Sequence, residues 1–191
     1  MKFKMKFKMK FKTKISSIAI ALMLLVSFGN VAYAAYYYSI IQGTLTFPDQ
    51  YNIEIKPTWN NYDYSGLLDT ARSAWNSSAA KIYFTRTSSP THTQYITITD
   101  YYFSNVGWDG FCYASYPTHL VADIQINDSH TLNPDYYESF HNRAELIAHE
   151  LGHTLRLDDV GVATVLMSNL GYIHTPNPTI DDIAGVNVSY K

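Results

Sequence analysis

The sequence predicts an α+β domain built on one mixed sheet with two or three helices. Segments with the alternation of strands come first after residue 35, and the strongest helical periodicity, over residues 142–155, comes later. Of the 191 residues, 157 follow residue 34, which is enough for one domain with a hydrophobic core of its own.

The first half should contain most of the strands. Residues 36–46 and 51–56 are expected strands, and alternation is clearest in the second, YNIEIK. Ser65 is a suitable N-cap for a helix over about 66–75. Its inward face should carry Leu67, Leu68, Ala71 and Trp75. Further strands are expected at 81–86, 94–99 and 120–126, with a loop at 104–111.

The second half should contain the principal helix. A polar link over 127–141 leads into it, and Asn142 with Glu145 has the spacing of a capping box. A stripe of apolar residues follows, with further apolar neighbours, so the helix should be buried on most sides; these are Ile147, Leu151 and Leu155 with Leu146 and Ala148. Thr179 is the expected N-cap of a closing helix over about 180–186.

The N-terminal segment has the pattern of a secretory signal peptide over 1–34. MKFK occurs three times, an apolar run follows over 15–28, and Ala32-Tyr33-Ala34 supplies a small-x-small cleavage site. An uncleaved membrane anchor is the alternative reading of the apolar run. With cleavage, we expect a secreted or extracellular domain over 35–191 with no membrane span; association with the cell wall is left open by the sequence.

The charge of that domain disfavours nucleic acid as a partner. Seven Lys and Arg face 16 acidic residues beyond residue 34, a net charge near −9 with neutral histidines. Cys112 is the single cysteine, so no internal disulfide supports the fold. Its apolar neighbours predict a buried, inert thiol, and we expect a monomer.

The most informative motif is His149-Glu150-Leu151-Gly152-His153. Positions i and i+4 of a helix lie one above the other, so the two histidines can direct their imidazoles at one metal ion. Glu150 projects beside that point, where it can act on water. This H-E-x-x-H pattern is typical of zinc peptidases. The alternative to a metal site is that the two histidines only make structural hydrogen bonds.

A catalytic zinc site needs a third protein ligand. Asp159 lies ten residues after His149, where a chain that leaves the helix by a sharp turn can return to the metal. Asp158 competes with it for this role. Tyr172 is a candidate substrate-binding residue that could line the cleft or stabilise an oxyanion.

The segment HELGHTLRLDD, with VLMS around Met167, resembles the metzincin peptidases, and most of all small bacterial matrixin-like enzymes. The resemblance covers about 105–190. It implies a metzincin-like domain with a twisted mixed sheet, an active-site helix, a Met-turn at Met167 and a C-terminal helix. An aspartate as third ligand is similar to the snapalysin group. The implied activity is that of a zinc metalloendopeptidase acting on protein or peptide substrates, with Glu150 as general base.

The chain departs from that family at three points. Arg156 stands where the family has glycine, and a left-handed turn there would cost about 1–2 kcal/mol and could displace Asp159. No propeptide cysteine motif precedes the domain. Calcium remains possible but unspecified by spacing, with candidate ligands Asp100, Asp109, Asp123 and Asp128. Arg156 is also the feature that favours the alternative function, a catalytically inactive metzincin-like binding module at the cell envelope.

Overall fold

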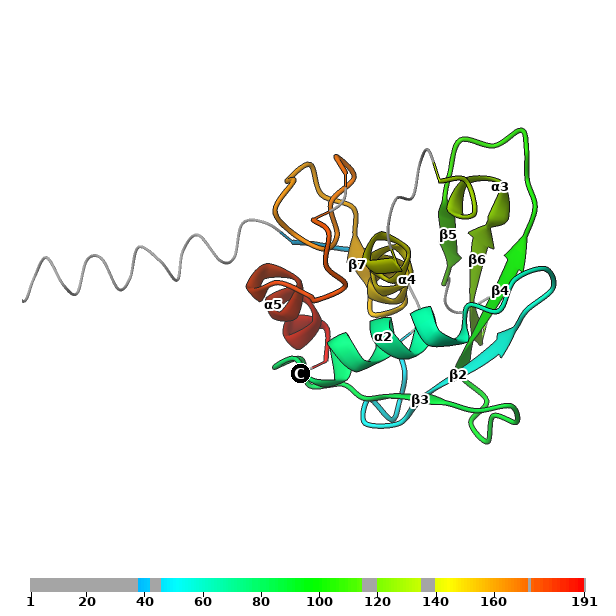
Figure 1. Cartoon of the computed structure of the whole chain (residues 1–191). Helices are drawn as coiled ribbons and strands as arrows, with labels where there is room; N and C mark the ends of the chain where they lie inside the picture. Colours follow the sequence, from blue (N-terminus) through cyan, green and yellow to red (C-terminus); the bar gives the residue numbers. More distant parts are fainter. Residues whose placement is uncertain (1–37, 42–45, 115–119, 135–139, 172, 191) are drawn as a thin grey trace, which may run out of the picture. The chain divides into compact units, whose positions relative to one another are not determined.

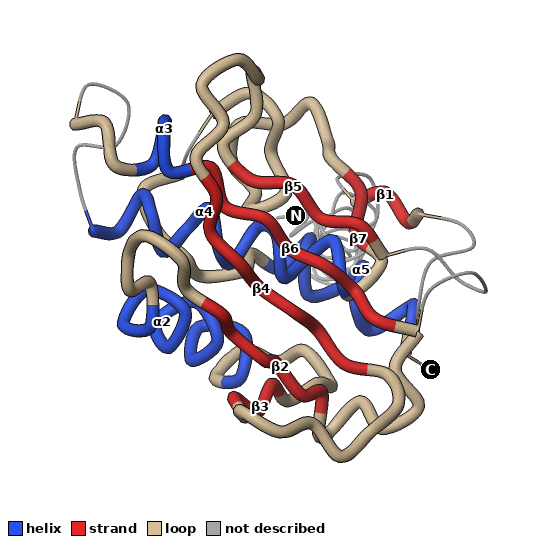
Figure 2. The backbone as a smooth tube through the Cα atoms, turned by 90° about the vertical axis from the view of Figure 1, so that its right-hand side faces the viewer, coloured by secondary structure: helices blue, strands red, loops and turns tan. Residues whose placement is uncertain are grey.

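The computed structural model describes residues 38–41, 46–114, 120–134, 140–171 and 173–190. This part of the chain has an α+β fold whose main sheet has five strands in the order β3-β2-β4-β6-β5. The strands are β2 (Ile53–Thr58), β3 (Phe84–Arg86), β4 (Tyr95–Tyr101), β5 (Gly110–Tyr113) and β6 (Val121–Asn127). Only β5 runs antiparallel to its neighbour, so the predicted mixed sheet is confirmed, and β5 forms one of its edges (Figure 2).

Two long helices, α2 (Ser65–Asn76) and α4 (Phe140–Thr154), pack on the same face of the sheet (Figure 1). The short α3 (Asp128–Thr131) follows β6 directly, and α5 (Ile180–Ser189) closes the described chain. A second, two-stranded sheet pairs β1 (Ser39–Ile40) with β7 (Leu157–Asp158), the segment that leaves α4. The principal helix is thereby enclosed between the sheet, α2 and its own trailing segment.

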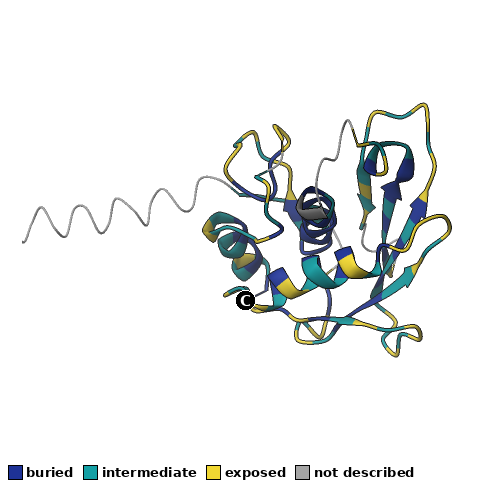
Figure 3. Ribbon diagram, in the orientation of Figure 1, coloured by how far each residue is buried: buried dark blue, intermediate teal, exposed yellow. Residues whose placement is uncertain are grey.

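The core lies between the sheet and these two helices. Along β4 the buried side chains alternate with partly exposed ones, as the sequence pattern predicts, and Ile96 and Ile98 face the helices. The four predicted inward residues of α2 are all buried. Trp75 Nε1 donates a hydrogen bond to the carbonyl oxygen of Ala148 at 2.9 Å, which joins α2 to the middle of α4. Most residues of α4 are buried, as expected (Figure 3).

Two predicted N-caps are wrong, although both helices exist. The N-cap position of α2 is Tyr64, and Ser65 begins the helix, where its Oγ accepts hydrogen bonds from Trp59 Nε1 and Arg86 Nη2. Helix α4 begins at Phe140, which places Asn142 and Glu145 inside it. The side chains of Ser65, Asn142 and Glu145 bond to other segments of the chain instead of capping a helix, so the local capping patterns were misleading.

Other boundaries also differ from the prediction. The polar link over 127–141 contains α3, because Asn127 caps a short helix by accepting a hydrogen bond from the backbone of Ser129. The predicted loop 104–111 ends in the first two residues of β5. The cap of the closing helix is confirmed: Thr179 and Asp182 form a capping box at the start of α5.

The predicted signal peptide over 1–34 lies outside the described residues. Within the described part of the chain, every helix is too short or too polar to cross a membrane.

Glu54 on β2 anchors the loop that leads into β4. Its carboxylate accepts hydrogen bonds from the backbone N–H groups of Thr91 and His92 and from the hydroxyl of Thr91. The backbone bond from His92 and those from Thr91 outweigh the opposing effect of burial and lower the pKa of Glu54 from 4.5 to about 2. The folded protein therefore favours the ionised form of this side chain.

Glu54→Gln should reduce the free energy of unfolding by about 1–2 kcal/mol at pH 7, because an uncharged amide replaces a carboxylate that accepts several bonds. The folded pKa of Glu54 lies below the unfolded one, so its contribution is complete above about pH 4.5 and is lost as the pH falls towards 2. Urea unfolding at pH 7 and at pH 3 measures this. A difference between variant and wild type that grows on acidification would contradict the account.

Candidate metal centre

Helix α4 presents His149 and His153 on the side that faces the cleft. Each side chain is 16% exposed, in contrast to the buried stripe on the same helix. The two Nε2 atoms lie 3.1 Å and 3.6 Å from one atom, Oδ1 of Asp159. The structure thus brings together the three residues that the sequence predicted as metal ligands, with their ligand atoms within 4.8 Å of one another.

The orientation of both imidazoles is fixed by backbone carbonyls. The Nδ1 of His149 lies 2.8 Å from the oxygen of Leu166, and the Nδ1 of His153 lies 2.8 Å from the oxygen of Leu157. An N–H on Nδ1 that donates to a carbonyl leaves Nε2 with its lone pair, the form that binds a metal. Both carbonyls belong to the segment that follows α4, so helix and trailing loop set the geometry together.

Asp159 reaches the histidines because the chain reverses sharply after α4. Arg156 takes a left-handed conformation, with φ 73°, and its N–H donates to the carbonyl of His153 at 3.0 Å. The left-handed turn after α4 is therefore made here by a residue that carries a side chain. Asp158 faces elsewhere, since its carboxylate accepts bonds from Ser39 Oγ and from the N–H of Asp159. Of the two candidate aspartates, Asp159 is the one placed beside the histidines.

Arg156→Gly should stabilise the protein by about 0.5–1 kcal/mol, because relief of left-handed strain exceeds the added entropy of an unfolded glycine. Thermal unfolding should shift upward by about 2 °C. Arg156→Ala is the matched control: it keeps the strained Cβ and loses the contact of the guanidinium with Thr46 Oγ1. Equal stabilisation by both substitutions would show that the strain is not at this backbone position.

Met167 packs against α4 close to the predicted ligands. Its Sδ lies 2.3 Å from the position that a Cβ on Gly152 would take. The methionine therefore packs directly on α4 at Gly152, the residue before His153. The N–H groups of Leu166 and Met167 both donate to the buried carboxylate of Asp182, at the start of α5. The turn around Met167 is therefore held between two helices, and it carries the carbonyl that orients His149.

Glu150 lies beside the three predicted ligands and is buried. Burial, with smaller effects of Asp159 and Asp109 and an opposing one of His149, raises its pKa from 4.5 to about 7. Within the described part of the chain, its Oε2 has no hydrogen-bond partner. Gly110 on β5 makes room for the other oxygen, since a Cβ there would lie 2.6 Å from Oε1. The carboxylate can therefore hold or release a proton near neutral pH.

The remaining electrostatics favour a cation at this point. Burial alone would lower the pKa of His149, but the hydrogen bond with Asp159 and the charge of Glu150 raise it to about 9. The same hydrogen bond lowers the pKa of Asp159, while burial and the charge of His149 lower that of His153. A divalent cation binding here competes with the proton that His149 and Asp159 share.

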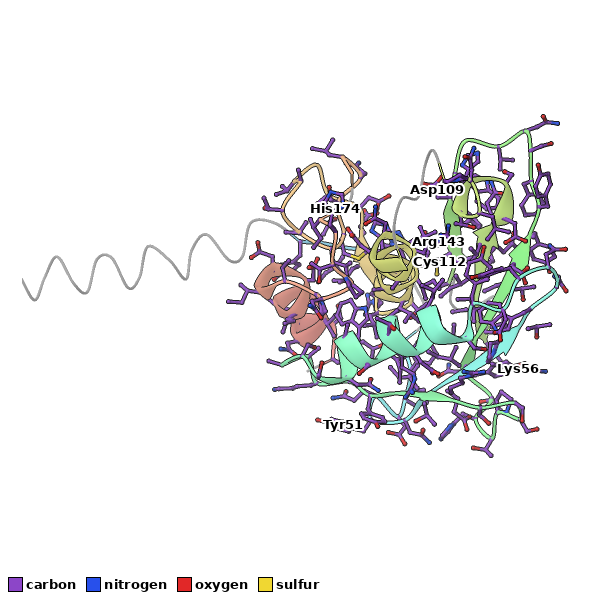
Figure 4. The ribbon with its side chains drawn as sticks, in the orientation of Figure 1. Tyr51, Lys56, Asp109, Cys112, Arg143 and His174 are labelled. Carbon is purple, nitrogen blue, oxygen red and sulfur yellow. The ribbon has the colours of Figure 1, made fainter. Side chains whose placement is uncertain are left out.

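Two cavities meet at this centre. One, of about 480 Å³, extends between Trp108 and the segment 168–171, and the other, of about 500 Å³, runs along β5. Both are lined by His149, Glu150 and Asp159. The three residues therefore lie in the middle of a cleft with an arm on either side, and one wall of that cleft is the edge strand β5. In Figure 4, Cys112 marks this strand beside α4.

The donor set fits zinc. Two imidazole nitrogens and one carboxylate oxygen are the three-ligand pattern of catalytic zinc, which leaves a further position open towards the cleft. Among the described residues, this is the only group of three or more metal-ligating side chains within reach of one ion. The four aspartates that were candidate calcium ligands do not form such a group. Asp100 accepts hydrogen bonds from backbone N–H groups, and Asp128 accepts one from the hydroxyl of Tyr64.

The other predicted residues have mixed outcomes. Tyr172 lies outside the described residues, although Gly171 before it lines the first cavity. Cys112 is only partly buried, whereas a buried thiol was predicted, and burial raises the pKa of that thiol. Gly110, Trp108 and Asp182 contribute to the site and were missed, because each is brought there by contacts between distant segments. Only the capping-box spacing before α5 gave any signal for Asp182.

Neither a scan of protein-family models nor a search of curated proteins finds a match for this chain.

Proposed function

We propose that this chain is a secreted zinc-dependent endopeptidase with a metzincin-like domain. The observation that carries the proposal is the convergence of His149, His153 and Asp159 on one point, with Glu150 buried beside it. The left-handed turn at Arg156 supports the metzincin-like assignment, and so does the packing of Met167 beneath the histidines. Secretion rests on the sequence pattern of residues 1–34.

The cleft favours cleavage within a chain over removal of a terminal residue. Its two arms give room for peptide on both sides of the reacting point. Edge strand β5 offers main-chain groups that can pair with an extended peptide whatever its side chains.

The chemistry divides between metal and protein. The Nε2 atoms of His149 and His153 and the carboxylate of Asp159 would hold zinc, which when bound would supply a Lewis acid for the scissile carbonyl and for water. Glu150 accepts the proton of the attacking water and passes it to the leaving amine. The carbonyls of Leu166 and Leu157 keep the histidines oriented throughout.

The proposal is tested by metal analysis of purified protein together with casein hydrolysis, with and without a chelator. We expect one zinc per chain, hydrolysis that the chelator abolishes, and recovery on return of zinc. A folded, zinc-loaded wild type that cleaves no member of a broad peptide library would exclude the enzyme. The inactive binding module would then be the better account.

Gly110→Ala should lower kcat by about 10- to 100-fold while zinc stays bound, because the new methyl displaces the Glu150 carboxylate from its position. Gly107→Ala, in the loop before β5, is the control, because an added Cβ there meets no atom within 4 Å. Zinc content and kcat of the two variants are compared with the wild type. Full activity of Gly110→Ala would mean that the position of this carboxylate does not limit the reaction.

A further inference from the structure

A buried glutamate of α4 holds a loop that lies beside the cleft. Glu145 is 2% exposed, and its two carboxylate oxygens accept hydrogen bonds from the backbone N–H groups of Ile173 and Thr175. The N–H of His174, between them, also bonds to this carboxylate. Three successive N–H groups thus converge on one side chain, an arrangement that suits an anionic group. We call Glu145 together with the backbone of 173–175 the loop clamp.

The backbone of the loop is shaped to this carboxylate. His174 has a left-handed conformation, with φ 62°, which residues with a side chain rarely adopt. Such a conformation turns successive N–H groups towards one point, and it persists where surrounding contacts hold it. Nδ1 of His174, labelled in Figure 4, lies 3.1 Å from Oδ1 of Asn142, about one turn before Glu145 on α4. Two side chains of α4 therefore fix the loop.

The loop clamp lies next to a wall of the cleft. Residues 168–171 line the cavity of about 480 Å³ together with Glu145 itself, and we call this cavity the 168–171 arm. The clamp begins two residues beyond Gly171. The other end of the wall is also fixed, because the N–H of Asn169 donates to the carbonyl of Val160 at 3.1 Å. The wall is therefore attached at one end to the segment that follows α4 and at the other end to α4.

We infer that Glu145 is a positioning residue, and that the loop clamp sets the shape of the 168–171 arm and so the affinity for the part of a peptide that enters it. This inference rests on the proposed endopeptidase function. Both oxygens of Glu145 are occupied by backbone N–H groups, so the side chain acts through the loop. A wall that is ordered before binding spares the peptide the entropic cost of ordering it.

Glu145→Gln tests the inference, because its side chain keeps the shape but turns an NH₂ group towards a backbone N–H. Kinetics use three peptides that share one cleavage site: a long peptide, and two that are truncated on either side of the scissile bond. KM should rise roughly tenfold for the long peptide and for one truncated peptide, while kcat and zinc content stay unchanged. The other truncated peptide should keep the wild-type KM. An unchanged KM for the long peptide, or an equal rise for both truncated peptides, overturns the inference.

Glu54→Gln is the matched control. Glu54 is also a buried glutamate that accepts bonds from two successive backbone N–H groups, and it lines neither arm of the cleft. This variant should lose stability and keep the wild-type KM for all three peptides. The same rise of KM in Glu54→Gln would mean that lost stability causes it, against the inference. If Glu145→Gln does not fold, His174→Pro disrupts the clamp from the loop and should raise the same KM.

Two further measurements separate this inference from the proposed function, because neither depends on cleavage. The amides of 173–175 should exchange hydrogen roughly tenfold faster in Glu145→Gln than in wild type. In calorimetry, zinc-loaded Glu150→Ala should bind the long peptide roughly tenfold more tightly than the same protein with Glu145→Gln added. If wild type cleaves nothing but both differences are observed, the peptidase fails and the loop clamp stands. Unchanged exchange or unchanged affinity overturns the loop clamp, whether or not cleavage occurs.

Discussion

Glu150→Ala should lower kcat for peptide hydrolysis by about 10²–10⁴-fold and leave the bound zinc in place, because it removes the proposed general base without removing a proposed ligand. Glu150 is buried next to the proposed ligands. The orientation of the two imidazoles is set by the carbonyls of Leu166 and Leu157, and not by Glu150. Initial rates on a fluorogenic peptide and zinc content by mass spectrometry measure the two effects separately.

Glu150→Gln is the conservative companion. It keeps the shape of the side chain against Gly110 and removes only the capacity to take a proton at neutral pH. Both variants should therefore lose activity to a similar extent. Wild-type rates in Glu150→Gln would exclude proton transfer by this residue and would leave the cleft without an identified base.

Asp159→Ala should weaken zinc binding by more than about 100-fold, since loss of a direct ligand costs more than loss of its supporting partners. Hydrolysis should fall with the metal and should not be restored at ordinary zinc concentrations. The structure offers Asp158→Ala as a matched control, because this neighbouring carboxylate bonds to Ser39 and to the backbone. Competition with a chromogenic chelator gives the zinc affinity of each variant.

The opposite result, zinc lost from Asp158→Ala and kept by Asp159→Ala, would reverse the assignment of the third ligand. It would also mean that the left-handed turn at Arg156 does not bring the third ligand to the metal.

The parts of the fold that could be predicted are those specified by short-range periodicity. Alternation along 95–99 and the apolar stripe of α4 each reflect one element facing one core, so position in sequence determines position in space. The i, i+4 spacing of His149 and His153 belongs to the same class. Asp159 was within reach of such reasoning because only one turn separates it from the helix.

The failures share a physical cause. Asn142 and Glu145 have the spacing of a helix start, but the helix begins earlier and Glu145 binds the backbone of Ile173 and Thr175, about 30 residues later. Gly110 has no local signal at all: its role appears only when β5 is placed against Glu150. Sequence patterns describe an element and its faces, whereas these contacts depend on which elements meet.

The most direct measurement is the position of zinc in crystals of the metal-loaded protein, found by anomalous diffraction at the zinc edge. We predict one strong peak within about 2.0–2.2 Å of Nε2 of His149, Nε2 of His153 and a carboxylate oxygen of Asp159. A peak elsewhere, or no peak at this point in protein shown by metal analysis to contain zinc, would contradict the account.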